Sequence, residues 1–274
     1  MPRFKATIRY NGTAYHGFQM QPELVTIQAV LQSTFERILR EPIIVNPSGR
    51  TDAGVHALAQ VIHFDASSDV ALQRLRESDF LYRINCLLPD DINILELYEV
   101  EDGFLARGAA QHKTYAYWIL QTPFQHPFFT NLAWQVPMPL DWPLMEKAAQ
   151  HIIGKHDFSA FCAADSAAVS KIRDLKSILF LKTSPAPFFT VAGDEWLCLE
   201  FNGDGFLKQM VRNIVGTLYE IGRGKWPPEK MREILNSKDR KQAAFTAPAC
   251  GLYLKDVHYD AKFCTPKARS LSHC

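Results

Sequence analysis

The stretch from Ile43 to Phe64 reads IIVNPSGRTDAGVHALAQVIHF, which is two apolar runs joined by a polar loop. The runs at 43–45 and 58–64 have the length and the β-branched residues of strands. The loop between them, Ser48 to His56, is longer than a usual hairpin connection. It holds arginine, threonine, aspartate and histidine between glycines that let the backbone bend tightly. Polar loops of this kind, held by a sheet, are where catalytic groups often lie.

The segments around this loop predict the rest of the first half. Residues 3–10 alternate between an apolar and a polar face, as a half-buried strand does. Apolar residues at helical spacing then run from a Thr26 cap to about Arg40. A second helix over about 70–86 and a strand over 92–98 complete the order β-α-β-β-α-β, which is ferredoxin-like.

The same order returns in the second half, without a detectable sequence repeat. The expected elements are a strand over 114–120, a helix that begins after Asp141 and ends at Gly154, strands over 178–182 and 196–201, a helix over 206–221, and a strand over 251–259. We therefore predict an α+β fold. It consists of two ferredoxin-like halves side by side, in one extended mixed and largely antiparallel sheet, with a central cleft for a large substrate. The halves are 1–104 and 105–262, and residues 263–274 are a C-terminal tail expected to be disordered.

Composition excludes several classes of protein. The 274 residues are 47% hydrophobic and 22% charged, as in ordinary globular proteins. No apolar run is long enough for a membrane span, and the N-terminus lacks a signal-peptide core, so a cytoplasmic address is expected. The six cysteines form no Cys-x-x-Cys pair, and no His/Cys/Asp group has zinc-like spacing. We expect reduced thiols and no metal site.

The net charge of +1 does not by itself indicate a nucleic-acid partner. Lysines and arginines nevertheless gather in several clusters, which gives a weak indication of RNA binding on one side of the protein. The candidate nucleic-acid-binding residues are Arg3, Lys5, Arg9, Lys171, Arg223 and Lys225.

Three side chains are candidates for a catalytic group, and each has a structural alternative. Asp52 is either a carboxylate for chemistry or a residue that stabilises its own turn. Arg212, beside the apolar stripe of the 206–221 helix, either reaches to solvent or pairs with Asp52 and keeps it ionised. Tyr115 is either a core residue or a ring that stacks on a base drawn out of an RNA helix.

Four stretches resemble the TruA family of tRNA pseudouridine synthases, and together they extend over most of the chain. The most specific is GRTDAGVHA at 49–57, which is similar to the family's active-site motif. The others are YNGTAYHGFQ at 10–19, the late helix around 206–216, and APACGLYL at 247–254. Three departures are Leu105 where the family has His, Phe18 where Trp is usual, and the lead 202–205 into the late helix. They leave the catalytic residues unchanged and bear on tRNA preference.

The resemblance implies a role for each candidate. Asp52 would be the catalytic aspartate, Arg212 its partner, and Tyr115 the active-site tyrosine. Arg50 would assist base extrusion, and Leu252 would contact the substrate. The implied enzyme is a homodimer that isomerises uridines in the anticodon stem-loop of tRNA, at positions 38–40, with the tRNA held across both subunits.

Pseudouridine formation detaches uracil from its ribose, turns it over and rejoins it through C5, so no cofactor is required. A positioned carboxylate can attack the ribose C1′ or the base C6, and the sequence leaves both routes open. Asp52 or Tyr115 can remove the C5 proton. A non-catalytic RNA-binding module would show an aromatic RNP signature, which is absent. A glycosidase-like hydrolase would need a second carboxylate, which the loop does not offer.

Overall fold

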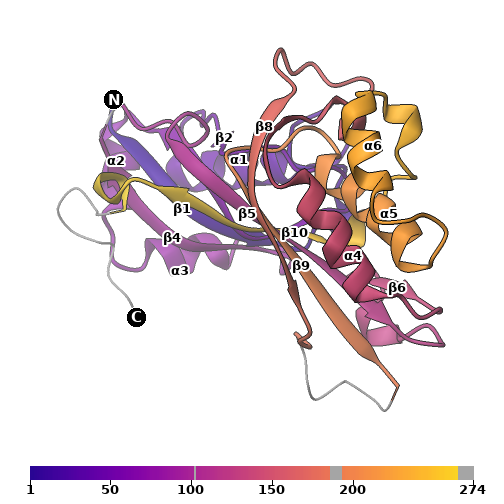
Figure 1. Ribbon diagram of the computed structural model, residues 1–274. Helices are drawn as coiled ribbons and strands as arrows, with labels where there is room; N and C mark the ends of the chain where they lie inside the picture. The colour runs from indigo at the N-terminus through magenta and orange to yellow at the C-terminus, as the bar shows by residue number, and fades with distance from the viewer. Residues whose placement is uncertain (102, 186–192, 265–274) are drawn as a thin grey trace. The chain divides into compact units, whose positions relative to one another are not determined.

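The computed structural model describes residues 1–101, 103–185 and 193–264 (Figure 1). The fold is α+β, with a mixed and largely antiparallel sheet of ten strands that does not close on itself. Two compact units divide the chain. The first contains Met1–Gln111 and the segment from Leu254 onward, and the second contains His112–Tyr253. These bounds differ from the predicted halves 1–104 and 105–262, and the predicted disorder of the tail falls mainly on 265–274, outside the described residues.

The first unit is built on β1 (Arg3–Tyr10), which lies between β3 (His56–Asp65) and β4 (Ile92–Val100) and is antiparallel to both. The register places Ala6 opposite Ile62 on one side and Leu97 on the other. The run 43–45 was expected to be a strand, but the residues that pair with β3 are those of β2 (Asn46–Pro47). The strand that precedes the polar loop therefore lies at Asn46–Pro47 and not at the predicted 43–45.

Helix α1 (Ile27–Leu39) of the first unit packs on β3 through aromatic rings. Its Phe35 ring lies 4.5 Å from that of Phe64. The Thr26 side chain accepts a hydrogen bond from the Ala29 N–H and so caps α1, as predicted. The prediction of a single helix over 70–86 is wrong. The structure has two helices, α2 (Asp69–Leu75) and α3 (Phe80–Asn85), because Ser78 and Asp79 favour turns and caps over helix interiors.

The second unit is built on β5 (Ala110–Gln121), β9 (Glu195–Gly203), β8 (Ile172–Leu181) and β7 (Gly154–Asp157), in that order across the sheet and antiparallel. A short strand, β6 (Trp134–Val136), is parallel to β5. The tenth strand is β10 (Leu252–Tyr259). β6 and β7 were not predicted, because they are short and take their conformation from their partners.

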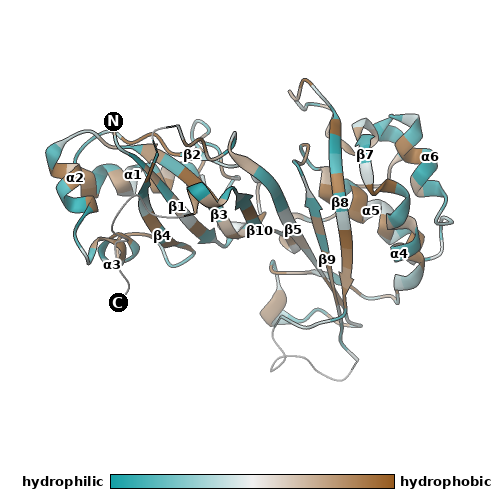
Figure 2. Cartoon of the chain, turned by 60° about the vertical axis from the view of Figure 1, so that its left-hand side comes forward, coloured by the Kyte–Doolittle hydropathy of each residue, from teal (hydrophilic) through white to brown (hydrophobic). Residues whose placement is uncertain are grey.

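Three helices gather on one side of the β8 and β9 strands of the second unit, and both ribbon views agree on this (Figures 1 and 2). They are α4 (Trp142–Ala149), α5 (Met210–Gly222) and α6 (Lys230–Ser237). The helix expected from 206 begins at Met210, because Gln209 has a φ of 60° that an α-helix does not accept. Helix α5 is buried over most of its length and is largely brown in the hydropathy view of Figure 2.

Short 3₁₀ helices connect these elements, at Gly12–Ala14, Pro127–Phe129, Gln150–Ile152, Ser159–Phe161, Arg240–Gln242, Ala249–Gly251 and Ala261–Phe263. None of the helices among the described residues has the length and apolar character that a membrane crossing requires.

Candidate active site

Asp52 lies in the loop between β2 and β3, and the backbone around it is tightly turned. The Val55 N–H donates to the Asp52 carbonyl at 3.1 Å, and Gly54 has a φ of +74°, in the left-handed region that glycine accepts without strain. The Asp52 side chain is half-buried, whereas Arg50, two residues earlier, is exposed.

The segment 10–18 holds the residue next to Asp52 in place. The Tyr10 and Thr51 hydroxyls share a hydrogen bond of 2.8 Å, and the Phe18 N–H donates to the Thr51 carbonyl at 3.0 Å. Burial raises the pKa of Tyr10 to about 12, so its hydroxyl stays protonated at neutral pH. Thr51 is therefore fixed through both its side chain and its backbone, and this restrains the backbone of the adjacent Asp52.

Two glycines allow this segment to approach the loop closely. A Cβ at Gly12 would lie 2.0 Å from the Val55 carbonyl oxygen. Gly17 has a φ of +91°, and a Cβ there would lie 2.8 Å from the Thr51 carbonyl oxygen. The Gly12 N–H also donates to Nδ1 of the buried His56 at 3.1 Å. The similarity of 10–19 to a family motif thus corresponds to a physical role as the wall of the Asp52 loop.

The base of the loop is anchored by buried polar groups. The Ser48 N–H donates to the Val61 carbonyl at 2.7 Å, and the Ser48 hydroxyl donates to the Gln60 side chain at 2.7 Å. The Gln60 amide in turn donates to the Gly49 carbonyl at 2.8 Å. A loop anchored at both ends and along one wall presents its carboxylate with little conformational freedom.

In the second unit, Tyr115 is a largely buried residue of β5. Its side chain is 8% exposed and meets the Phe206 ring edge-on, with 5.0 Å between the ring centroids. The neighbouring Tyr117 donates its hydroxyl to the Pro248 carbonyl at 2.8 Å, and burial raises its pKa well above the usual range. Leu252, at the start of β10, is 6% exposed.

Arg212 lies in the first turn of α5 and is half-buried. Its Nε donates to the Ala247 carbonyl at 2.7 Å, and the Ala247 N–H donates to the Arg212 carbonyl at 3.1 Å. This pair of bonds ties α5 to the segment 243–247 and sets the direction of the guanidinium. Such fixation distinguishes Arg212 from an arginine that reaches freely to solvent.

Sequence reasoning missed the group that supports this segment. The fully buried Asn213 donates to the Phe161 carbonyl at 2.8 Å and accepts from Arg240 at 2.9 Å and from Thr246 at 2.7 Å. Arg240 also donates to the Ala244 carbonyl at 2.9 Å. The signal was present in the sequence, because an asparagine inside an apolar helix stripe must have partners.

Arg3 and Lys5, two of the residues expected to bind nucleic acid, make contacts inside the first unit. Arg3 pairs with both oxygens of Asp65, at 2.7 and 2.9 Å, and donates to the Phe104 carbonyl. Lys5 is 5% exposed; its Nζ donates to the Tyr98 hydroxyl at 2.7 Å and lies 4.9 Å from the centre of the Tyr259 ring. Burial lowers the pKa of Lys5. Phosphate binding by either residue stays a prediction.

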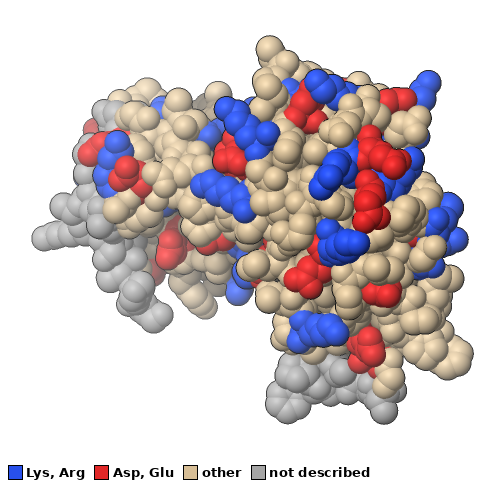
Figure 3. All heavy atoms as spheres, viewed as in Figure 1, with Lys and Arg blue, Asp and Glu red and all other residues tan. Residues whose placement is uncertain are grey.

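The other candidates differ in exposure. Arg9 is exposed, and Lys171 donates to the Ser166 carbonyl at 3.1 Å. Arg223 and Lys225 are exposed and both face Glu220, at 3.6 and 3.1 Å. On the face drawn in Figure 3, lysines and arginines alternate with acidic residues and form no continuous basic patch.

The described residues contain no group of three or more His, Cys, Asp or Glu side chains that could hold a metal ion.

Known proteins resemble this chain over nearly its whole length. The profile of the family described as tRNA pseudouridine synthase matches residues 148–260. Proteins named tRNA pseudouridine synthase A are similar throughout. The one from Pelobacter propionicus is 41% identical over 260 residues, which cover 94% of this chain and 100% of that protein. The one from Thermoanaerobacter sp. (strain X514) is 40% identical over 252 residues, 92% of this chain and 97% of that protein. The one from Myxococcus xanthus is 40% identical over 259 residues, 94% of this chain and 92% of that protein. With this identity along the whole chain, and with the Asp52 motif set in a clamped loop, the chain belongs to the tRNA pseudouridine synthase A (TruA) family.

Proposed function

We propose that Asp52 performs the chemistry of a tRNA pseudouridine synthase in this chain, an isomerase that needs no cofactor. The observation that supports this most directly is the loop itself. A half-buried carboxylate follows Thr51, which is held through its hydroxyl and its carbonyl. A nucleophile held in this way loses little conformational freedom when it attacks.

The reaction breaks two bonds and forms two within a single nucleotide, since the proton lost from C5 is balanced by a proton gained at N1. The glycosidic C1′–N1 bond breaks, the uracil turns over, and C5 bonds to C1′ while its proton leaves. Asp52 acts covalently, at C1′ or at C6, and is released when the new bond has formed. The proton from C5 passes to a base, for which Asp52 and Tyr115 are the candidates.

We propose supporting roles for four more residues. Arg212 is the charge partner that keeps Asp52 ionised, because a guanidinium stabilises a nearby carboxylate. Tyr115 stacks on the extruded uracil, Leu252 contacts it, and the exposed Arg50 assists its extrusion. The directed guanidinium of Arg212 and the edge-on packing of Tyr115 support these roles.

The proposal includes the finer architecture and the partners. The order β4-β1-β3, with β2 paired to β3, supports ferredoxin-like halves with a cleft for the flipped base. The substrate segment is the anticodon arm, positions 38–40, and the enzyme is a cytoplasmic homodimer. Phosphates of the tRNA contact exposed cations. Arg9, Arg223 and Lys225 are exposed and therefore more accessible to phosphates than the less exposed Arg3, Lys5 and Lys171.

Release of tritium from C5-labelled uridine in tRNA tests the function, because only exchange at C5 frees the label. The wild-type chain should release it, and Asp52→Asn should release none while binding tRNA within a few-fold of wild type, since affinity comes from phosphate contacts. Asp90→Asn, at an exposed aspartate of the same unit, is the matched control and should behave as wild type.

Substantial turnover by Asp52→Asn would contradict the assignment of Asp52. A folded Asp52→Asn variant that has lost tRNA binding altogether would contradict it as well. A wild-type chain that binds tRNA and frees no tritium would contradict the function itself.

A further inference from the structure

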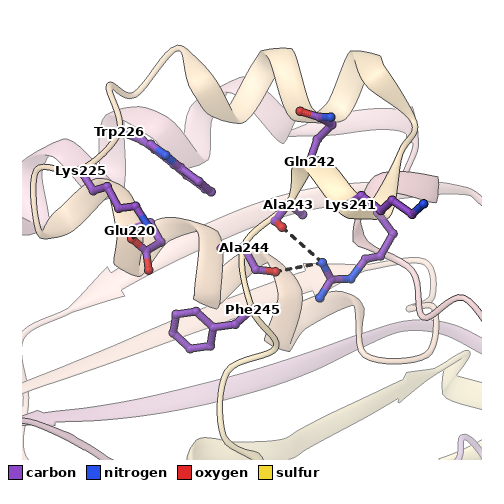
Figure 4. Close-up of a pocket in the computed structure, with 9 residues that line it drawn as sticks. Glu220, Lys225, Trp226, Lys241, Gln242, Ala243, Ala244 and Phe245 are labelled. Carbon is purple, nitrogen blue, oxygen red and sulfur yellow. Dashed lines mark hydrogen bonds and ion pairs between the residues drawn. The ribbon is translucent and has the colours of Figure 1, made fainter.

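The second unit contains a cavity of about 450 Å³ that the proposed catalytic residues do not line. It lies between the end of α5 with the turn after it and the segment 240–245 (Figure 4). Its lining combines aromatic rings, lysines and one carboxylate. The residues that matter for the argument are Glu220, Lys225, Trp226, Lys241 and Phe245.

Phe245 offers a fixed aromatic surface at this cavity. Its side chain is 44% exposed, although large apolar groups are usually covered. The rings of Trp134 and Tyr219 meet it edge-on, at 5.9 and 5.7 Å between centroids, and hold its orientation. An exposed ring that is already held in place can stack on a planar ligand at little entropic cost.

The cations around the cavity are held at its rim. Lys225 Nζ lies 3.1 Å from Glu220 and 5.5 Å from the centre of the Trp226 ring. Lys241 is exposed on the segment that Arg240 fixes through the Ala244 carbonyl (Figure 4). The two lysines and Arg240 outnumber the single carboxylate, so the cavity favours an anion.

The cavity continues the row of contacts that begins at Arg212. Arg212, Gly216 and Glu220 are four residues apart and therefore lie along one side of α5. The segment 243–247 runs beside them, since Ala247 bonds to Arg212 and the Phe245 carbonyl lies against Gly216. Two helical turns separate Arg212 from Glu220, about 12 Å along the axis. A stacked strand covers that length in a few nucleotides.

We propose that this cavity binds one unpaired nucleotide of the tRNA strand whose uridine is modified, with its base on Phe245 and its two flanking phosphates at Lys225 and at Lys241, which lie at opposite ends of the pocket (Figure 4). The inference rests on the proposed function, because the strand is located through the role of Arg212. Aromatic rings next to cations are how proteins hold single-stranded nucleic acid without reading its sequence. The site would hold the strand on one side of the target while the uridine leaves the stack.

Binding of tRNA to the Asp52→Asn protein tests the proposal without interference from turnover. In that background, Phe245→Leu should raise the Kd by roughly tenfold, because base stacking on one ring is lost. Lys241→Gln should raise the Kd and lower the slope of log Kd against log salt by about 0.7–0.9, the loss of one phosphate contact. The matched controls are Phe124→Leu, at an 82% exposed ring, and Lys155→Gln, at an exposed lysine of β7. Both should leave Kd and slope unchanged.

Ultraviolet cross-linking of bound tRNA, followed by mass spectrometry of the peptides, should place a cross-linked nucleotide on residues 240–247. Binding by Phe245→Leu and Lys241→Gln as tight as by their controls would overturn the proposal, as would cross-links confined to other peptides. Lys241→Gln alters an exposed side chain, so the salt slope decides even if Phe245→Leu folds poorly. Weaker binding by these variants, together with a wild-type chain that binds tRNA and frees no tritium, would refute the proposed function and leave the cavity assignment standing.

Discussion

Arg212 owes its direction to the Ala247 carbonyl, and a lysine cannot reproduce that contact together with a second donor. We expect Arg212→Ala to lower the single-turnover rate by orders of magnitude, because the proposed pairing with the half-buried Asp52 would be lost, and removing one partner of a buried ion pair costs about 3 kcal/mol or more. Arg212→Lys should lie between, because an ammonium lacks the planar fork.

Rapid-quench measurement of tritium release at saturating tRNA checks this prediction. Arg76→Ala, at an exposed arginine of the first unit, is the control. A near wild-type rate for Arg212→Ala would show that the guanidinium only ties α5 to its neighbour.

Asp65 makes the first unit sensitive to acid. Its hydrogen bonds to Arg3 hold the pKa of the Asp65 carboxyl below its usual value, against the opposing effect of burial. A lowered folded pKa stabilises the native state above the unfolded pKa, and this stability is lost as the pH falls through the folded pKa. Asp65→Asn should therefore lower the free energy of unfolding by about 1 kcal/mol at pH 7, since the pair is partly exposed.

Urea unfolding followed at pH 7 and again below about pH 3, where an aspartate is largely protonated, measures the difference. The deficit of Asp65→Asn should shrink at the lower pH. An equal deficit at both values would mean that the asparagine disturbs packing and that the charge is unimportant.

At the scale of elements, α5 depends on a glycine that helix propensity disfavours. Alanine at 216 would gain about 1 kcal/mol of propensity, but its Cβ would lie 2.0 Å from the Phe245 carbonyl oxygen. We expect Gly216→Ala to destabilise the protein by about 3 kcal/mol, as overpacking against a backbone does. Thermal melting compares it with Gly103→Ala, where a Cβ meets nothing within 4 Å. An unchanged or higher melting temperature for Gly216→Ala would show that the segment 243–247 moves aside easily.

The sequence predicted those elements whose burial has a clear period. The apolar face of β1 is buried as its residue pattern predicts, and α1 buries Ile27, Leu31, Phe35 and Ile38 at helical spacing. β7 has only four residues, Gly-Lys-His-Asp, and its pairing with β8 is a contact that no local pattern encodes. In α6 the buried Met231, Ile234 and Leu235 follow helical spacing, but the helix was not predicted, because Lys230 and Arg232 were interpreted as part of a basic cluster.

The sequence predicted the part of the candidate site that consists of contiguous residues. It did not predict the features that depend on contacts with residues far away in the chain. The Asp52 loop is contiguous, so its motif could be found directly. Lys5 is buried by Tyr98, Tyr259 and the Phe263 carbonyl, which are 93 or more positions away in the sequence. A basic residue on a polar strand face gave no indication of that enclosure.

For the whole molecule, the net charge of +1 is small for a protein that holds a long polyanion. Cations of two subunits along one tRNA would double the available contacts, which motivates the proposed dimer. Sedimentation equilibrium should show a dimer at the concentrations that give activity, and tRNA affinity should fall steeply with salt. The Lys155→Gln variant, which should keep the wild-type salt slope, is the control for that salt dependence. A monomer that is fully active at low concentration would refute the dimer.

The first unit is discontinuous, because it takes most of its last strand, β10, from Leu254 onward, while the second unit is one unbroken segment, His112–Tyr253. Lys5 meets the Phe263 carbonyl across 258 positions of the chain. During synthesis on a ribosome, the N-terminal part of the first unit is made before the second unit, but its contacts with residues from Leu254 onward form only after the second unit has been translated. The part translated first is therefore the part finished last. A truncated product that lacks the final strand leaves the Asp52 unit exposed to proteases, however well the rest has folded.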